Sequence, residues 1–586
     1  MGSFFLYKSG CQIDSAEAVN VFQKKGFGQP ITCTFLDWTL CFFEKQVSES
    51  SDFFMDENGF ILVDGSAMYK NMKKEAVLRT LFEDYKNNQI DYSELNGHYN
   101  IVIGYKEHIM IISDPLVSKH MFCDNHYRFI STSMLACAFA IPEKLHINKN
   151  SVLEKMAISI IIAPDTLFEE IYCIDNHVAE KIHSTNPGIK FHFEKNTLSD
   201  AVTFGNNMEK CIDTQIRSLD RYFQQLKSYS HGQRIDTGLS AGYDSRLIFS
   251  MMAKHFPNQI HVHTHSTKGV HDKEKSVAEK LAALLELTCA EINTLPIGEI
   301  DYLEELMKEN VYFFDGRSSF VIGGFNQTYT AGYRKKATEG CNLTLTGVGG
   351  EVYRNYYHVL RKNKSIAYYL KKYIINSKFK EAVGTEQYSQ IISLILDKVY
   401  SRLEIDSQDK GHLLFRRYYS EIMMADGQGV MLDAYNQVSD CFAPFISMDI
   451  LRNAYTDTDL IGFDGEFEAE MIKHINYDMA EITSSYRHNF VNIPKKYILK
   501  QILRALIPAS IWNGAASVVK KQKVTSSDPY LQSVLDMCGF YQEAFDFFKE
   551  QFPDVDFNTL FSGEYELKNI SMIVVTLYLL KDKIEP

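Results

Sequence analysis

The sequence lacks the patterns that would tie the chain to a membrane, to structural zinc or to a disulfide framework. Its longest apolar runs, Ala157 to Pro164 and Ile570 to Leu580, are shorter than the ~20 residues that cross a bilayer. The 11 cysteines form no CxxC pair and their count is odd, which argues against zinc and paired disulfides. We therefore expect a cytoplasmic protein that makes no membrane contact.

Basic residues are fewer than acidic residues. Lysine and arginine number 61 against 74 aspartates and glutamates, so the formal net charge is −13 at pH 7. A chain of this charge has no general attraction to the phosphates of nucleic acids or to anionic lipid. Nucleic acids are therefore not expected among its partners.

The chain has the length and apolar content of two or more domains. It has 586 residues, of which 45% are hydrophobic, and a domain ordinarily takes about 100–200 residues. Short β-like runs at Gly59 to Asp64 and at His98 to Gly104 are separated by a helical stretch from Lys74 to Tyr85. This pattern predicts a first domain that is rich in sheet.

A polar stretch from Glu194 to Asp200 marks the expected boundary between a domain over residues 1–200 and one over residues 201–586. Beyond it, runs of strand length alternate with helical periods, which is typical of a doubly wound parallel sheet in an α/β fold. The expected order is strand Gln233 to Leu239, helix Asp244 to His255, strand Gln259 to Thr264, helix Lys273 to Leu287 and, later, strand Asn342 to Thr346. The remainder is mostly helical by period and predicts an elaboration of the second domain.

The most informative segment is the turn from Leu239 to Arg246, between an expected strand and an expected helix. Small residues let backbone N–H groups face an anion, and a helix N-terminus carries unpaired donors and about half a positive charge. Ser240 and Ser245 add hydroxyl groups, so the turn suits a pyrophosphate. Asp244 would repel that anion unless Mg2+ lay between them. The alternative is an ordinary strand-to-helix turn that is capped by Asp244 or Ser240.

A second turn, Thr346 to Glu351, also follows an expected strand and brings three glycines and a carboxylate. The carboxyl ends of parallel strands meet at one edge of the sheet, where ligands of open α/β sheets bind. We therefore expect Asp244 and Glu351 to hold one Mg2+ from two sides.

These two turns resemble motifs of the asparagine synthetase family, whose synthetase domain carries an S-G-G-x-D-S pyrophosphate loop and a later S-G-x-G-x-D-E turn. Ser240, Gly242, Asp244 and Ser245 match the first motif. Looser matches follow in the family's order: Thr346, Gly347, Gly349 and Glu351 in the second turn, Leu95 to Tyr99, Ser113 to Leu116 and Phe129 to Ser133 in the first domain, and Pro444 with Phe445, Ile507 to Ser510 and Lys521 to Lys523 in the second.

The resemblance implies a fold, a reaction and two cofactors. It implies an N-terminal Ntn-type αββα glutaminase-like domain, followed by a PP-loop synthetase domain that uses ATP and Mg2+. Such a domain adenylates a substrate carboxylate, and an amine then displaces AMP, so the chain would be an AMP-forming carbon–nitrogen ligase. The resemblance implies that Ser240, Gly242 and Ser245 bind the pyrophosphate and that Asp244 and Glu351 bind Mg2+. It implies backbone contacts to adenosine from Leu239, Thr346 and Gly347. Lys523 would stabilise the intermediates, with Lys520 and Lys521 as substitutes. The alternative for these lysines is a merely solvated loop.

The sequence departs from the family at the glutaminase nucleophile. The family uses a Cys that becomes the first residue after Met removal, with its free amine as base, whereas position 2 here is Gly2. The family's glutamine-binding Asn-Gly-Glu segment appears only as Asp64, Gly65 and Ser66. We expect the first domain to have lost glutaminase activity and to act as a scaffold or a substrate-docking surface, as in the β-lactam synthetases and lasso peptide cyclases that lack this Cys. A cloning remnant at position 2 is the alternative explanation.

The second domain departs from the family too, and a second hypothesis follows from that. Five positions differ from the family's residues: Ala241, Val348, Glu351, Val352 and Phe442. Val348 cannot accept a proton, so either the base comes from elsewhere or the attacking amine is already neutral. The second hypothesis is a catalytically silent relative that binds nucleotide or a partner protein. For the ligase, the expected partners are small-molecule or peptide carboxylates and amines, and a homodimer or a biosynthetic partner protein is left open.

Two further groups of residues are weaker indications of a site than the motifs are. His261, His263 and His265 alternate along an expected strand, where they could hold zinc; we prefer a contact between His265 and the adenine. Asp315 either faces the substrate together with Arg317 or only forms a turn.

Overall fold

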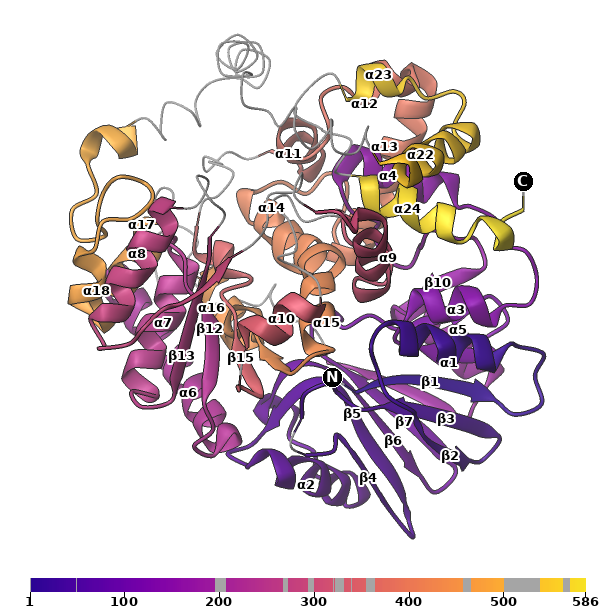
Figure 1. The fold of residues 1–586 in the computed structure, drawn as a ribbon, viewed down its shortest axis with the longest axis horizontal. Coiled ribbons are helices and arrows are strands. Elements are labelled where there is room, and N and C mark those ends of the chain that lie inside the picture. The colour runs from indigo at the N-terminus through magenta and orange to yellow at the C-terminus, as the bar shows by residue number, and fades with distance from the viewer. Residues whose placement is uncertain are drawn as a thin grey trace.

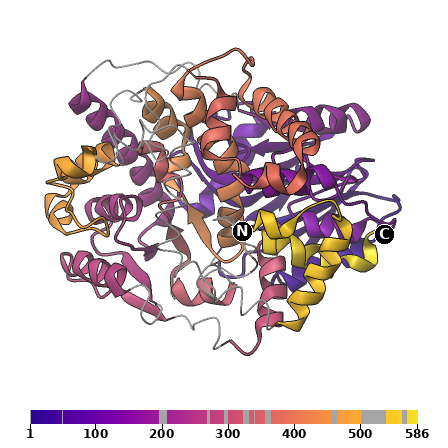
Figure 2. The same ribbon diagram turned by 90° about the horizontal axis from the view of Figure 1, so that it is seen from above.

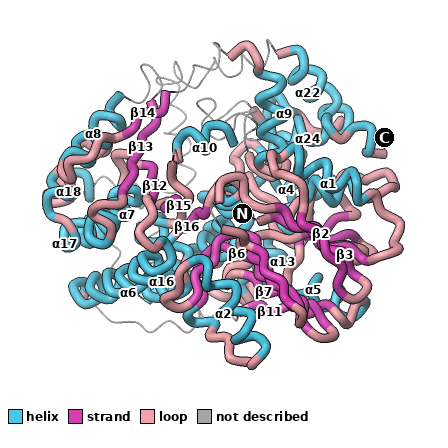
Figure 3. Tube along the Cα trace, turned by 60° about the horizontal axis from the view of Figure 1, so that its bottom comes forward, coloured by secondary structure: helices cyan, strands magenta, loops and turns pink. Residues whose placement is uncertain are grey.

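The computed structural model describes residues 2–48, 50–194, 207–266, 272–293, 300–319, 321, 331–338, 340–354, 364–456, 465–499, 538–561 and 570–585. These residues form a mixed α/β protein with three sheets, as expected from the sequence. Figure 3 shows the strands gathered in two groups with helices around them.

Two sheets in residues 2–194 pack face to face. Their strands are β1 (Ser3–Lys8), β2 (Ile31–Phe35), β3 (Trp38–Phe43), β4 (Phe53–Asp56), β5 (Gly59–Tyr69), β6 (Leu95–Tyr105), β7 (His108–Ser113), β8 (Phe122–Asp124), β9 (Phe129–Ser131), β10 (Ile171–Cys173) and β11 (Ile189–Phe193). The strand orders are β10-β8-β9-β1-β3-β2 and β11-β7-β6-β5-β4, and all pairs are antiparallel except β11 with β7. Phe60 and Leu62 of β5 join the core between the sheets, whereas Ile61 and Val63 alternate to the other face.

Helices cover the outer faces of this pair of sheets (Figure 1). The outer-face helices are α1 (Ser15–Lys24), α2 (Lys74–Lys86) and α3 (Met134–Ala140), and α4 (Lys149–Ile158) shares the cluster of α1 and α3. The buried residues of α5 (Asn176–Thr185) instead join the core between the sheets. On α1, Phe22 stacks on Phe43 of β3 with ring centroids 4.2 Å apart. On α2, Leu81 and Phe82 are buried in the same cluster as Ile61 and Val63. The layers are therefore helix, sheet, sheet and helix.

The third sheet is parallel throughout, which confirms the expected α/β alternation. Its strands are β12 (Ile235–Gly238), β13 (Ile260–Ser266), β14 (Ala290–Asn293), β15 (Leu343–Leu345) and β16 (Asp440–Phe442), in the order β14-β13-β12-β15-β16. The helices that join or flank these strands are α6 (Met208–Ser230), α7 (Asp244–His255), α8 (Asp272–Ala283) and α10 (Ala331–Ala337). Ile260 and Val262 of β13 share a core with α6, α7 and α8, while Tyr333 of α10 contacts His265 on the opposite face.

The remaining elements are mainly helical, again as expected. They are α9 (Leu303–Phe313), η4 (Gly350–Tyr353), α11 (Ile366–Tyr373), α12 (Phe379–Val383), α13 (Thr385–Leu403), α14 (His412–Tyr418), η5 (Tyr419–Gln428), α15 (Gly429–Asn436), η6 (Pro444–Ile446), α16 (Met448–Thr456), α17 (Glu466–Ile475), α18 (Tyr477–Glu481), α22 (Gly539–Gln551), α23 (Phe557–Leu560), α24 (Ser571–Leu579) and η9 (Lys581–Lys583). Figures 1 and 2 both place the C-terminal helices on the far side of the molecule from the parallel sheet.

The C-terminal helices tie the two halves of the chain together. Ile584 forms a bridge with Leu145, and the Leu145 N–H donates to the Lys583 carbonyl at 2.8 Å. Nearby, α13 of the second half packs against α4 of the first. The expected domain boundary near residue 200 lies outside the described residues. The apolar run that begins at Ile570 is the buried helix α24, and no helix in the described parts of the chain has the length and apolar content to cross a membrane.

Candidate functional site

The turn between β12 and α7 is built from small and hydroxylated residues, and its shape is held by their hydroxyl groups. The Ser240 and Ser245 hydroxyl oxygens are 2.9 Å apart. The Gly242 N–H donates to Ser240 Oγ at 3.2 Å, and the Ser240 N–H donates to Ser245 Oγ at 3.1 Å. Leu239 is buried beneath the turn. In the described structure the N-cap residue of α7 provides no side-chain cap to the first turn, and the first N–H groups of a helix have no partner within the helix itself.

The second turn lies directly against the first. The Thr346 N–H donates to the Phe442 carbonyl at 3.0 Å, which fixes the turn to β16. A Cβ atom on Gly347 would lie 3.0 Å from the Asp244 backbone, and a Cβ on Gly350 would lie only 2.1 Å from Asp244 Oδ1. The glycines are therefore what allows the two turns to meet, as expected for the edge of one sheet.

Three carboxyl groups converge on one guanidinium at this meeting point. Arg354 Nη2 donates to Asp244 Oδ2 at 2.5 Å and lies 3.6 Å from Glu351 Oε1. Arg354 Nε lies 3.5 Å from Oε2 of Glu468, which is fully buried on α17. Tyr419 donates to Glu351 Oε2 at 2.6 Å. Asp244 and Glu351 are thus brought to one cation, and that cation is Arg354.

The charges of this cluster shift its pKa values. Burial raises the pKa of Asp244 to about 6; Arg354 opposes this rise and Glu351 adds to it. Burial and the neighbouring Asp244 raise the pKa of Glu468 well above its usual range. Burial alone would lower the pKa of Arg354, but the carboxyl groups outweigh it and raise that pKa. The site is therefore rich in negative charge and organised around a cation.

Two residues of this cluster were not expected from the sequence. Arg354 is three residues beyond Glu351 and could have been noticed from that spacing, because residues three apart share a helical face. Glu468 carries no local signal, since it is 224 residues from Asp244 in the sequence. Lys520, Lys521 and Lys523 lie outside the described residues.

No family model matches the chain, and no curated protein matches it. The function is therefore inferred from the residues of the site.

At the start of β1 lies Gly2, the position that aligns, in the resemblance noted from the sequence, with the nucleophile of asparagine synthetases. Gly2 is buried and forms a bridge with Asp64. A Cβ atom on Gly2 would lie 2.0 Å from Cε2 of the Phe42 ring. The space that a cysteine side chain would need is therefore filled by Phe42.

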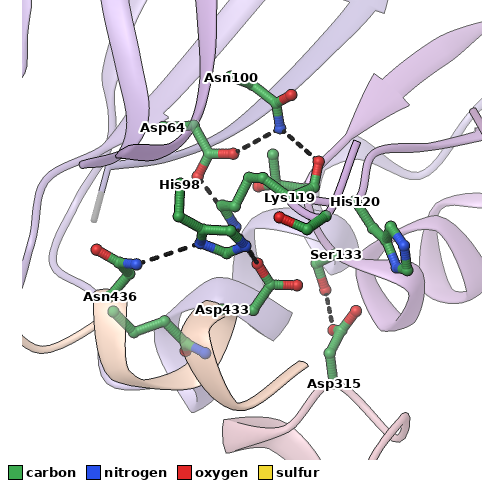
Figure 4. Close-up of polar contacts among 12 residues, drawn as sticks. Asp64, His98, Asn100, Lys119, His120, Ser133, Asp315, Asp433 and Asn436 are labelled. Carbon is green, nitrogen blue, oxygen red and sulfur yellow. Dashed lines mark hydrogen bonds and ion pairs between the residues drawn. The ribbon is translucent and has the colours of Figure 1, made fainter. Parts of the chain in front are cut away.

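Beside this position lies a buried network of charged and polar groups that joins the two halves of the chain (Figure 4). Asn100 Nδ2 donates to Asp64 Oδ2 at 3.1 Å, and Lys119 Nζ lies 3.4 Å from Asp64 Oδ1 and 3.0 Å from Asp433 of α15. Burial raises the pKa of Asp64 to about 6, against the opposing effect of Lys119. Asp433 also pairs with Arg317. The network connects the face-to-face sheets to the helical part of the chain.

Asp315 and Arg317 lie in the same region and contact residues of the first half of the chain. Asp315 accepts from Lys25 Nζ at 3.0 Å and also from the Ser133 hydroxyl and the Met134 N–H, so it caps α3. Its φ of +57° and that of Gly316, +67°, show a tight turn. The interpretation as a turn therefore fits the geometry, and the carboxyl is engaged across the interface.

The three histidines of β13 do not share one partner. His261 Nδ1 and His263 Nδ1 lie 2.9 Å and 2.7 Å from Oδ1 of the buried Asp236, while His265 contacts Tyr333. Burial would raise the pKa of Asp236, but His263 and His261 outweigh it and hold that pKa well below its usual range. The ligand atoms of Asp236, His261 and His263 lie within 4.8 Å of one another, and the short nitrogen–oxygen distances are those of a hydrogen-bonded cluster.

Proposed function

We propose that the chain is an ATP-dependent, AMP-forming amide-bond synthetase with no glutaminase activity of its own. The observation that carries this proposal is the contact between two glycine-rich turns, which places Asp244 and Glu351 on one cation. The start of α7 and the hydroxyl groups of Ser240 and Ser245 lie beside them. This is the arrangement that a metal-bound triphosphate needs at the edge of a parallel sheet.

The residues of the site fit Mg2+ and a nucleotide. Within the described residues Asp244 Oδ1 is a buried oxygen that accepts no hydrogen bond, and the side chain of Glu351 is 23% exposed. Carboxylate oxygens are the ligands that Mg2+ prefers. Mg2+ held there would neutralise charge on the phosphates. Ser240, Gly242 and Ser245 would hold the pyrophosphate. Backbone groups of Leu239, Thr346 and Gly347 would contact the adenosine.

The proposed reaction has two steps. A substrate carboxylate oxygen attacks the α-phosphorus of ATP, and pyrophosphate leaves to give an acyl-adenylate. An amine nitrogen then attacks the acyl carbon, loses a proton and displaces AMP, which forms the amide bond. By resemblance to the asparagine synthetases, Lys523 would stabilise these intermediates. We propose small-molecule or peptide carboxylates and amines as substrates, the cytoplasm as location and a homodimer or a biosynthetic partner protein as the assembly.

We propose that residues 1–200 form a degenerate glutaminase-like Ntn domain and residues 201–586 the PP-loop synthetase domain. The helix-sheet-sheet-helix layers support the first assignment, and the parallel sheet with its two turns supports the second. The loss of glutaminase activity is supported by the Phe42 ring beside Gly2.

Glutamine is expected to release no ammonia when it is incubated with this protein, and Gly2→Cys is expected not to create the activity. The added side chain would overlap Phe42, and overpacking of this kind costs roughly 1–3 kcal/mol. Ammonia release and the free energy of unfolding are the two measurements. Gly28→Ala is the matched control, because a Cβ there meets nothing within 4 Å. Ammonia formation by either the unchanged protein or the Gly2→Cys variant would contradict the proposal for the first domain.

A second candidate function is a silent relative that binds a nucleotide or a partner protein without activating carboxylates. The pairing of Asp244 with Arg354 favours it, because the guanidinium already neutralises the proposed metal ligand. ATP–pyrophosphate exchange with a panel of carboxylic acids separates the two candidates. Exchange with any acid supports the synthetase, and binding of ATP without exchange supports the silent relative.

Removal of Arg354 is expected to create a need for a divalent cation. Arg354→Met leaves the carboxyl groups of Asp244, Glu351 and Glu468 without their cation, and breaking a buried ion pair costs about 3–5 kcal/mol. We expect millimolar Mg2+ to restore much of this stability in the variant and to change the unmodified protein little, as measured by urea unfolding. Arg416→Met is the control, because Arg416 contacts the same η4 helix through the Val352 carbonyl. If Mg2+ stabilised Arg354→Met no more than it stabilised Arg416→Met, the assignment of the carboxyl groups as metal ligands would be contradicted.

A further inference from the structure

A cluster of one carboxyl and two imidazole groups lies on one face of the parallel sheet. Strands β12 and β13 lie side by side (Figure 1), and their register pairs Asp236 with His261 and Gly238 with His263. Side chains two residues apart point to the same face of a strand, so both imidazoles lie on the face of Asp236. The intervening Val262 points into the core that the sheet shares with α6, α7 and α8. The cluster therefore belongs to the opposite face of the sheet.

The ligand atoms of this cluster converge on one place. Nδ1 of His261 and Nδ1 of His263 face the same oxygen, Asp236 Oδ1, at 2.9 Å and 2.7 Å, while Asp236 Oδ2 has the Thr344 hydroxyl at 3.4 Å. The side chains of Asp236 and His263 are 0% and 2% exposed, and that of His261 is 10% exposed. Among the described residues, these are the only three His, Cys, Asp or Glu side chains whose ligand atoms lie within 4.8 Å of one another.

The donor set suits a transition metal better than Mg2+. Imidazole nitrogens suit Zn2+, whereas Mg2+ is held by carboxylates, carbonyls and water. Two histidines and one carboxylate, with water in the fourth position, are a recurrent set of zinc ligands. Ligand atoms that are bonded to one Zn2+ at about 2.1 Å in a tetrahedron lie roughly 3.4 Å apart. The two Nδ1 atoms would therefore move away from Asp236 Oδ1 by only about 0.5–0.7 Å to admit the ion.

The protonation of the cluster is compatible with a cation. A carboxyl group must be ionised and an imidazole neutral to bind a metal. Burial would raise the pKa of Asp236, but His263 and His261 hold that pKa well below its usual range. A neutral imidazole carries one proton, on either Nδ1 or Nε2. With Zn2+ at Nδ1, each ring would keep its proton on Nε2, and bonds to the metal would replace the two hydrogen bonds to Asp236.

The cluster lies directly beneath the turn between β12 and α7. The Leu239 N–H at the start of that turn donates to the His263 carbonyl at 2.8 Å. We propose that Asp236, His261 and His263 bind one Zn2+ ion, which fastens β12 to β13 beneath this turn. The 10% exposure of His261 leaves a side for a water ligand. Zn2+ binding here is independent of the synthetase reaction, because it needs neither ATP nor the Mg2+ proposed at Asp244.

Titration of the full chain with Zn2+ tests this assignment. The protein is treated with a chelator, dialysed and titrated in millimolar Mg2+ without nucleotide, against a chromophoric chelator as competitor. We expect one equivalent of Zn2+ to bind and to raise the thermal midpoint. Asp236→Asn and His263→Ala each remove a ligand. The affinity is expected to fall by roughly 100-fold or more in both variants, since even the partners of metal ligands contribute about 10–100-fold.

His265→Ala is the matched control, because His265 lies on the same strand and contacts Tyr333 instead. We expect this control to bind Zn2+ as the unmodified protein does. Unchanged affinity in Asp236→Asn and His263→Ala, or no binding by the unmodified protein, would overturn the proposal and leave a hydrogen-bonded cluster only.

A second measurement decides the question if the variants do not fold. X-ray absorption at the zinc edge identifies the ligands of Zn2+ bound to the unmodified protein. Two imidazole nitrogens with oxygen ligands support the site, and any other set, such as one with sulfur, contradicts it. Loss of ATP–pyrophosphate exchange would contradict only the synthetase proposal, so the two failures are distinguishable.

Discussion

Asp244→Asn is expected to reduce ATP–pyrophosphate exchange by roughly 100-fold or more. The substitution removes the charge of one of the two carboxylates proposed to hold Mg2+, and a bound metal contributes several kcal/mol to stabilising charge in such reactions. The fold is expected to survive, because Arg354 still faces the carboxyl groups of Glu351 and Glu468 when Asp244 loses its charge. Exchange is measured with whichever carboxylic acid supports it in the unmodified protein.

Asp220→Asn is the matched control for this substitution. Asp220 lies on α6, pairs with Lys254 and His255 at the other end of α7, and is 23% exposed, much like Asp244. We expect this control to retain the exchange activity of the unmodified protein. Full exchange activity in Asp244→Asn would remove Asp244 from the proposed mechanism.

Gly350→Ala is expected to weaken the binding of Mg2+-ATP about tenfold or more without removing any charge. The new methyl group would lie 2.1 Å from Asp244 Oδ1 and 2.8 Å from its Cβ, so the carboxylate must leave its place beside Arg354 and Glu351. Displacing a group that holds a reacting centre costs affinity even when its chemistry is intact. Equilibrium dialysis with Mg2+-ATP measures the effect.

Gly539→Ala serves as the control for Gly350→Ala, because a Cβ at that glycine meets no atom within 4 Å. The thermal midpoint of both variants is measured as well, to separate a local displacement from a general loss of stability. If Gly350→Ala bound Mg2+-ATP as tightly as the unmodified protein, the close approach of the two turns would have no bearing on the nucleotide.

Local patterns in the sequence predicted the helices and strands that surround the site. The helix expected over Asp244 to His255 is α7 with the same limits, and the one expected from Lys74 is α2, one residue longer. The expected strand Gln233 to Leu239 is shorter in the structure, as β12 over Ile235–Gly238. Strand ends are less certain because side-chain alternation continues into the adjoining turns.

The partners of charged side chains could not be predicted in the same way. Arg354 contacts Asp244 and Glu468 across 110 and 114 residues of sequence. The Phe42 ring beside Gly2 is a similar case, because two strands bring it there. Such contacts depend on how whole elements pack, and no spacing between residues along the chain encodes them.

The sequence by itself determined the parallel alternation of strands and helices, the two glycine-rich turns and the chemistry that each turn offers to an anion or a metal. Apolar periodicity and turn composition act over a few residues, so they can be read without the fold. Only the tertiary structure decided that a guanidinium lies between Asp244 and Glu351, and that the Phe42 ring fills the space beside Gly2. The reason is that electrostatic interactions depend on distance and burial in space, which are set when distant segments pack together.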